Sequence, residues 1–144
     1  MRPLAAAPLL YALACGGSLT TPDYVAQPTS ALVAVPQAPP PAHVEFVPPQ
    51  PARATVWIDG EWLWDAGRWS WRSGRWVVPP TGCRFAPWTM VRGPDGTIYY
   101  AGGSWRDSND QIVSDPTPIA SARLGRGQVV DPAGEPVVTG RTIH

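Results

Sequence analysis

Aromatic and polar positions follow a regular order between residues 57 and 77. Three copies of W-x-x-G-x-W succeed one another at seven-residue spacing, beginning at Trp57, Trp64 and Trp71. A coiled-coil heptad needs an aliphatic seam and tolerates glycine poorly, whereas every copy here carries a glycine between two tryptophans. Short strands joined by glycine-containing turns fit the pattern better. The repeat therefore predicts antiparallel β structure.

Two-residue turns at Asp59-Gly60, Ala66-Gly67 and Ser73-Gly74 would fold the repeat into a four-stranded meander. Side chains alternate between the two faces of a strand, so this register places all six repeat tryptophans on one face. A three-residue loop at the second or third turn is an open alternative that would shift the pairing. The expected pairs are Trp57 with Trp62, Trp64 with Trp69, Trp62 with Trp71, Trp71 with Trp76, Glu61 with Arg72, and Asp65 with Arg68.

The tryptophan face is too large to be left bare on a soluble monomer. Each indole buries about 150–250 Å² when it is covered. Three kinds of cover are open: the rest of the chain, which would make the tryptophans core; a partner protein; or a glycan stacked on the flat rings. The candidate binding surface consists of Trp57, Trp62, Trp64, Trp69, Trp71 and Trp76.

Further strands are expected after the repeat. Residues 83–92 form an extended segment, Gly93-Pro94-Asp95-Gly96 is a hairpin turn, and residues 97–100 are rich in β-forming residues. A tight turn at Gly102-Gly103 would bring Tyr100 opposite Trp105. The fold class is therefore mainly β, a small antiparallel meander of six or seven short strands over residues 53–107. Residues 108–144 are expected to form a loosely ordered, irregular tail, with one hairpin over residues 129–138.

The N-terminus has the form of an export signal over residues 1–14. Its apolar stretch, Leu4 to Ala14, is shorter than the roughly 20 residues of a membrane-spanning helix. The tract from Ala12 to Cys15 resembles a bacterial lipobox, although Ala12 holds the place where leucine is usual. Cys15 is thus the candidate lipidation site, and an acyl chain would anchor the protein. The alternative is a secreted protein in which Cys15 forms a disulfide with Cys83.

Residues 15–52 are expected to begin with the acylated Cys15 and to continue as a disordered, proline-rich tether. Nine prolines lie between residues 18 and 54, and no glycine follows Gly17 in that stretch. Proline fixes φ and restricts the residue before it, which favours polyproline II and coil. Such a segment would act as a semi-rigid spacer between anchor and module.

Composition narrows the function classes. Eleven basic and eleven acidic residues give a net charge of zero, and the arginines do not cluster, so a nucleic acid is not an expected partner. The only histidines, His43 and His144, are far apart, and no catalytic or metal motif occurs, so neither an enzyme nor a cofactor is expected. Turn formation and charge pairing account for Asp59, Glu61 and Asp65 more simply than a pair of glycosidase carboxylates does.

The repeat, with Pro79-Pro80-Thr81-Gly82 and residues 95–101 after it, resembles the YXWGXW (WXXGXW) repeat family of small bacterial envelope proteins, many of them predicted lipoproteins. The resemblance covers residues 55–106. It implies a non-enzymatic β module in the cell envelope, at the outer membrane or on the periplasmic face. The partners it implies are the membrane, through the lipid anchor, and an envelope protein or glycan such as peptidoglycan.

Overall fold

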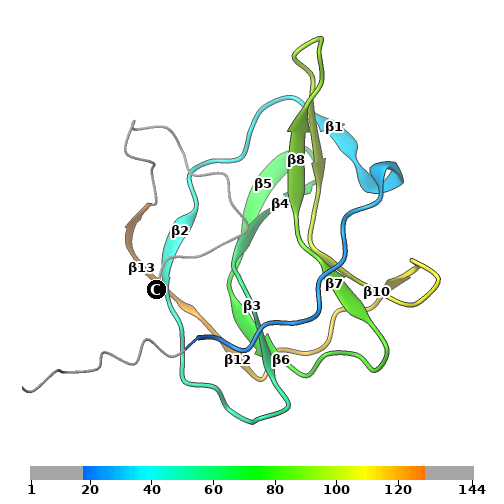
Figure 1. Ribbon diagram of the computed structural model, residues 1–144. Helices are drawn as coiled ribbons and strands as arrows, with labels where there is room; N and C mark the ends of the chain where they lie inside the picture. Colours follow the sequence, from blue (N-terminus) through cyan, green and yellow to red (C-terminus); the bar gives the residue numbers. More distant parts are fainter. Residues whose placement is uncertain (1–17, 129–144) are drawn as a thin grey trace, which may run out of the picture.

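The computed structural model describes residues 18–128, and their regular structure is almost entirely antiparallel β (Figure 1). One short 3-10 turn (Thr29–Ala31) is present, and no α-helix occurs within the described range. The mainly β prediction is confirmed. The strands are β1 (Val33–Val35), β2 (His43–Phe46), β3 (Val56–Ile58), β4 (Glu61–Asp65), β5 (Arg68–Arg72), β6 (Arg75–Val77), β7 (Arg84–Ala86), β8 (Thr89–Arg92), β9 (Ile98–Ala101), β10 (Ser104–Arg106), β11 (Ile112–Val113), β12 (Ala120–Ser121) and β13 (Arg123–Gln128).

The tryptophan repeat forms one long, bent hairpin over residues 56–77. β3 pairs with β6, and β4 pairs with β5. The register is continuous across the bend, because Ile58 lies opposite Arg75 and Glu61 lies opposite Arg72. Two residues on each strand are thus left unpaired between the two ladders. The chain bends at these positions and does not reverse.

The repeat turns only once, at Ala66 and Gly67. Their φ angles of 48° and 78° fit the type I′ turn that two-residue hairpins prefer. The expected turns at Asp59-Gly60 and Ser73-Gly74 are wrong, because the chain continues forward there into the second ladder. The expected pairs of Trp62 with Trp71, Trp64 with Trp69, Glu61 with Arg72, and Asp65 with Arg68 are confirmed. The expected pairs of Trp57 with Trp62 and of Trp71 with Trp76 are wrong, because Trp57 pairs with Trp76.

A second bent hairpin follows over residues 84–106. β7 pairs with β10 and β8 with β9, again with two unpaired residues on each strand between the ladders. Its turn lies at Gly93–Gly96 as expected, where the Gly96 amide donates to the Gly93 carbonyl at 2.9 Å. The expected turn at Gly102-Gly103 is wrong, since these residues form the bend, and β9 does not pair with β10.

The proline-rich segment is part of the fold and not a disordered tether. β1 pairs with β9, and β2 pairs with β13. Before them, the Thr20 carbonyl accepts the Trp57 amide at 2.7 Å, and Tyr24 bridges Phe85. The expectation of a spacer over residues 15–52 is therefore wrong from residue 18 onward.

The physical reason lies in what proline removes and what it keeps. Proline lacks an N–H donor, but its carbonyl is a full acceptor and its extended geometry is close to that of a strand. The Pro41 carbonyl accepts the indole N–H of Trp62 at 3.1 Å, and the Pro48 carbonyl accepts that of Trp76 at 2.8 Å. Indoles are donors only, so proline carbonyls and tryptophan rings complement each other.

The segment after residue 108 is also more ordered than expected. β11 extends the β7–β10 sheet, β12 extends the β3–β6 sheet, and β13 pairs with β2. The prediction of an irregular tail is wrong as far as residue 128. The hairpin predicted over residues 129–138, the signal segment 1–14 and Cys15 lie outside the described residues.

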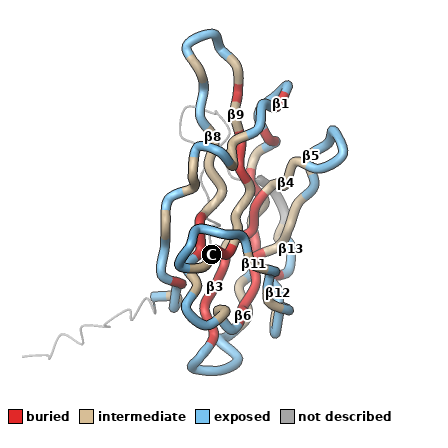
Figure 2. The backbone as a smooth tube through the Cα atoms, turned by 90° about the vertical axis from the view of Figure 1, so that its right-hand side faces the viewer, coloured by how far each residue is buried: buried red, intermediate tan, exposed pale blue. Residues whose placement is uncertain are grey.

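Burial is greatest along the inner strands of the two hairpins and least at their tips (Figure 2). Three clusters make up the core, and each draws on segments distant in sequence. None of the helical structure described is long and apolar enough to cross a membrane. The three clusters are centred on Trp105 with Phe85, on Tyr100 with Val35, and on Trp57 with Trp76.

Candidate functional site

The six repeat tryptophans form three cross-strand pairs and not one open face. The rings of Trp57 and Trp76, whose centroids lie 5.4 Å apart, are only 2% and 1% exposed. The other two pairs, Trp62 with Trp71 and Trp64 with Trp69, have centroid distances of 5.3 and 5.0 Å and are half-buried. All three pairs pack edge to face, the arrangement that aromatic quadrupoles favour.

Strand β2 and its neighbours cover two of these pairs. The His43 ring packs on Trp62 and Trp71, with centroid distances of 5.1 and 4.9 Å. Val47, four residues further on, packs against the cluster of Trp57 and Trp76. The alternation of strand side chains thus directs every second residue of this segment onto the tryptophans. Cover by the rest of the chain, one of the three open readings, is what the structure shows for these pairs.

The third pair is covered from a different direction. Trp64 and Trp69 pack against the cluster of Val35, Ile98 and Tyr100. The Tyr100 ring meets Trp69 edge to face at 4.9 Å, and its hydroxyl donates to the Trp62 carbonyl. Burial raises the pKa of the Tyr100 phenol above its usual value, because the phenolate would be desolvated.

A buried glutamate explains why the repeat needs glycine at its bend. Glu45 is 1% exposed and accepts hydrogen bonds from the Gly74 amide at 2.9 Å and from the Trp71 indole at 2.8 Å. A Cβ added at Gly74 would lie 2.8 Å from the Glu45 carboxylate and overlap the Trp57 ring. Gly60 has the same problem, with the carboxylate 2.6 Å from an added Cβ. Glycine is therefore needed at both bend positions because the Glu45 carboxylate and an indole ring lie directly against the backbone there.

A second buried glutamate holds the bend of the other hairpin. Glu61, 2% exposed, accepts the Gly103 amide at 2.8 Å and forms an ion pair with Arg72. An added Cβ at Gly103 would lie 2.7 Å from Phe85 and 2.9 Å from the Glu61 carboxylate. Glu61 therefore links the first hairpin to the second.

Arg72 and Arg75 both approach the carboxylate of Asp115. Arg72 also pairs with Asp115, whereas Arg75 lies 3.8 Å from the same carboxylate. Both terminal nitrogens of Arg75 are buried without a hydrogen-bond acceptor among residues 18–128. Desolvation, followed by the charge of Arg72, lowers the pKa of Arg75. This site thus carries a buried like-charge contact.

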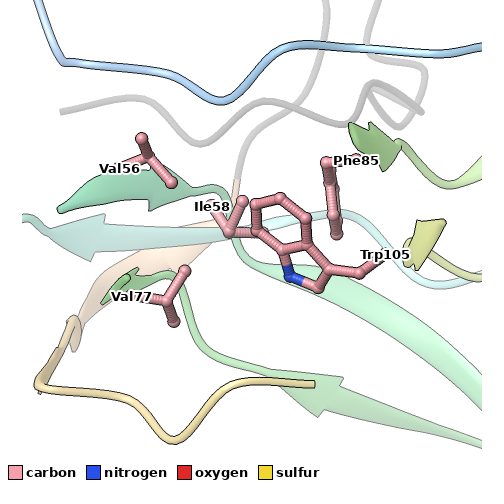
Figure 3. Close-up of a cluster of buried hydrophobic side chains, with 5 residues drawn as sticks. All are labelled: Val56, Ile58, Val77, Phe85 and Trp105. Carbon is pink, nitrogen blue, oxygen red and sulfur yellow. The ribbon is translucent and has the colours of Figure 1, made fainter. Parts of the chain in front are cut away.

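Trp105 occupies the centre of the remaining cluster (Figure 3). Its ring lies among Val56, Ile58, Val77 and Phe85, which come from both hairpins, and the Phe85 ring centroid is 5.3 Å away. Cys83 is half-buried against this cluster and forms no disulfide with a described residue.

A hollow that the sequence did not reveal opens where the two bends meet. It has a volume of about 270 Å³. No pattern in the sequence points to it, because it forms only when the bends of separate hairpins are brought together. Its wall consists of Tyr24, Ile58, Asp59, Glu61, Phe85, Pro87 and Trp88.

The histidine considered for a metal site stands apart from other ligand side chains in residues 18–128, whereas Asp59 and Glu61, two of the carboxylates considered for catalysis, both line the hollow. His43 packs between tryptophans, and no group of three His, Cys, Asp or Glu side chains in this range is arranged to hold a metal ion. Asp59 accepts the Trp57 indole N–H at 2.8 Å, and Glu61 is held by Arg72 and Gly103. His144 lies outside the described residues.

Of the comparisons with known proteins, one identifies the repeat and the other two find no match. The family model of the WXXGXW repeat matches residues 56–77 in two copies. No curated protein matches the chain. No solved structure matches it either. The matched residues coincide with the first bent hairpin, from the start of β3 to the end of β6. Residues 56–77 are thus a WXXGXW repeat region.

Proposed function

We propose that this chain is a bacterial cell-envelope lipoprotein, anchored through an acylated Cys15 after removal of residues 1–14, with a non-enzymatic β module that has a structural or protein-interaction role. The tract from Ala12 to Cys15 supports the anchor, and the observation that carries the structural role is the burial of the repeat. Trp57 and Trp76 are almost fully enclosed, and they tie the proline-rich segment to the hairpin. The repeat therefore works as a scaffold, and the surface it supports is what a partner would meet.

The described part of the module begins close in sequence to the proposed anchor. Leu19 packs against the cluster of Trp57 and Trp76. Leu19 is four positions after Cys15, a length of chain that spans at most about 14 Å. An acyl chain on Cys15 would therefore hold the module against the membrane surface, at the outer membrane or on the periplasmic face, with no long spacer between them.

Exposed apolar side chains on the β2–β13 sheet favour a protein partner. Phe46 is 65% exposed and Leu124 is 55% exposed, although both lie in regular strands. Aromatic side chains such as Phe46 are enriched at the centres of protein–protein interfaces. A photo-crosslinking residue at position 46 is expected to capture an envelope protein in cells, whereas one at Asp95, on the exposed hairpin turn, is not.

The alternative role, glycan binding on the repeat, requires open indole faces. The covered positions of Trp57 and Trp76 favour the scaffold role. We expect the tryptophan emission of the intact protein to stay unchanged when soluble peptidoglycan fragments or surface polysaccharide are added. A saturable shift in the emission maximum would favour the glycan alternative.

Intact mass and membrane fractionation test the anchor. The wild type is expected to begin at Cys15, to carry acyl chains and to sediment with membranes, and the Cys15→Ala variant is expected to be released. Cys83→Ala is the matched control, because it removes the other cysteine and should leave both mass increment and fractionation unchanged. A wild-type protein that is soluble and unacylated would contradict the proposal.

A further inference from the structure

The hollow between the two bends is lined by aromatic rings and carboxylates. Three of its lining residues are aromatic, namely Tyr24, Phe85 and Trp88. Two more, Asp59 and Glu61, are carboxylates, and none of the lining residues within 18–128 is basic. Aromatic faces carry negative electrostatic potential. The charge of Glu61 is balanced by its ion pair with Arg72, so the carboxylate of Asp59 is the one that acts in the same direction as the rings.

Both carboxylates are held in place by the fold. The Trp57 indole donates to Asp59 at 2.8 Å, and the Gly103 amide donates to Glu61 at 2.8 Å. Arg72 binds Glu61 but does not line the hollow. A ligand entering it would therefore meet fixed groups that need little reorganisation, which favours binding.

We propose that this hollow binds an organic ammonium group, with the cation held by the aromatic walls and by the carboxylate of Asp59. Cation–π attraction to aromatic cages is the recognised way in which proteins hold ammonium groups, and a carboxylate adds direct charge attraction. The volume of about 270 Å³ is close to the lower end of small-ligand pockets, about 300 Å³. It suits an ammonium head group with a few carbons and not an extended polymer.

The site does not depend on the lipid anchor or on the scaffold role proposed above. The ammonium group has two chemical sources, a quaternary head group and a primary amine, and the two share the positive charge that the hollow recognises. Choline represents the first source and ethanolamine the second. The neutral probe is 3,3-dimethylbutan-1-ol, which has the shape of choline without its charge.

Titration of the full chain, followed by the indole N–H resonance of Trp88 in proton–nitrogen spectra, tests the proposal. We expect saturable shifts with choline, with ethanolamine or with both, and at least tenfold weaker binding of the neutral probe. Raised ionic strength should weaken ammonium binding further. Equal binding of choline and its neutral counterpart, or no saturable binding of either ammonium compound, would overturn the proposal.

Matched variants separate the site from general charge effects. Asp59→Asn keeps an oxygen acceptor for the Trp57 indole but removes the charge, so we expect at least tenfold weaker binding with little change in stability. Asp65→Asn makes the same charge change at an exposed position near the tip of the first hairpin and should leave affinity unchanged. If the two variants bind equally well, the role given to Asp59 is wrong.

Discussion

The hairpin of residues 56–77 and the hairpin of residues 84–106 both bend after leaving two residues on each strand unpaired. At each bend a glycine amide donates to a buried glutamate, Gly74 to Glu45 and Gly103 to Glu61. In both cases the glycine lacks space for a Cβ because an aromatic ring covers it.

The aromatic residues around the two bends differ. The first hairpin has Trp71 and Trp76 on either side of its bend glycine, whereas the second has Tyr100 and Trp105 at the same spacing. The ring that covers the glycine is Trp57 in the first and Phe85 in the second. The comparison teaches that the glycine and its glutamate define the bend, while the identity of the rings can vary.

The largest expected effect comes from filling the bends. Gly74→Ala and Gly103→Ala should each lower the free energy of unfolding by about 3 kcal/mol, at the upper end of the cost of overpacking, because the added methyl meets both a ring and a carboxylate. Urea denaturation measures the change. Gly67→Ala is the control: nothing lies within 4 Å of its added Cβ, and its φ of +78° should cost only about 1 kcal/mol.

Unequal results would break the comparison. If Gly103→Ala cost no more than Gly67→Ala, the second bend would have room that the first one lacks. The two hairpins would then share a backbone path without sharing the packing that causes it.

Removing the charge of each buried glutamate should lower the free energy of unfolding by different amounts at the two bends. Glu61→Gln weakens an ion pair with Arg72, and hydrogen bonds to charged groups contribute about 1.5–3 kcal/mol, so we expect a loss of about 2 kcal/mol. Glu45→Gln keeps one acceptor oxygen for the Gly74 amide or the Trp71 indole and should cost about 1 kcal/mol. Thermal or urea unfolding of both variants measures the difference, and equal losses would show that Arg72 adds nothing to the bend.

The sequence was sufficient to predict the class of fold and the tip of each hairpin. The pairs of Trp62 with Trp71 and Trp64 with Trp69 followed from a two-residue turn at Ala66-Gly67, which is a local signal. The turn at Gly93–Gly96 followed in the same way.

The bends could not be predicted because their cause is not local. Gly60 and Gly74 look like turn residues in the sequence, yet Glu45 and two indoles, brought there by the fold, are what exclude a side chain. The proline-rich segment was predicted to be disordered for a related reason, because its partners are also distant in sequence. Its carbonyl groups accept indole N–H groups and so stabilise the fold. The number of prolines indicates only that backbone N–H donors are missing, not which carbonyls find partners. The hollow could not be predicted either, because its lining comes from the bends of two separate hairpins.

Alkaline pH provides a smaller test, because Tyr100 belongs to the second hairpin but bonds to the first. Its pKa is raised by burial from the ordinary value of 10.0, so above that pH the unfolded chain loses its proton while the folded chain keeps it. Stability from this group is complete below pH 10 and declines above it, by about 1 kcal/mol at pH 11. Urea midpoints at pH 8 and pH 11 should fall less for Tyr100→Phe than for wild type. Parallel pH profiles would show that the hydroxyl is not buried between the hairpins.

The smallest expected effect lies at the tip of the first hairpin, far from its bend. Ala66 has a φ of 48°, a conformation that asparagine adopts more readily than alanine. Ala66→Asn should therefore raise the free energy of unfolding by about 0.5 kcal/mol, and Ala66→Val should lower it, because a β-branched side chain is strained there. A small rise in melting temperature for the first variant and a fall for the second would show that the tip follows local turn rules. Ala66 and Gly67 are exposed, and nothing lies within 4 Å of a Cβ added at Gly67. The stability of the tip should therefore change independently of Gly74, and the double variant Ala66→Asn with Gly74→Ala should show additive effects. A non-additive result would mean that tip and bend are coupled along the strands, and the bend could then no longer be treated as a separate device shared by the two hairpins.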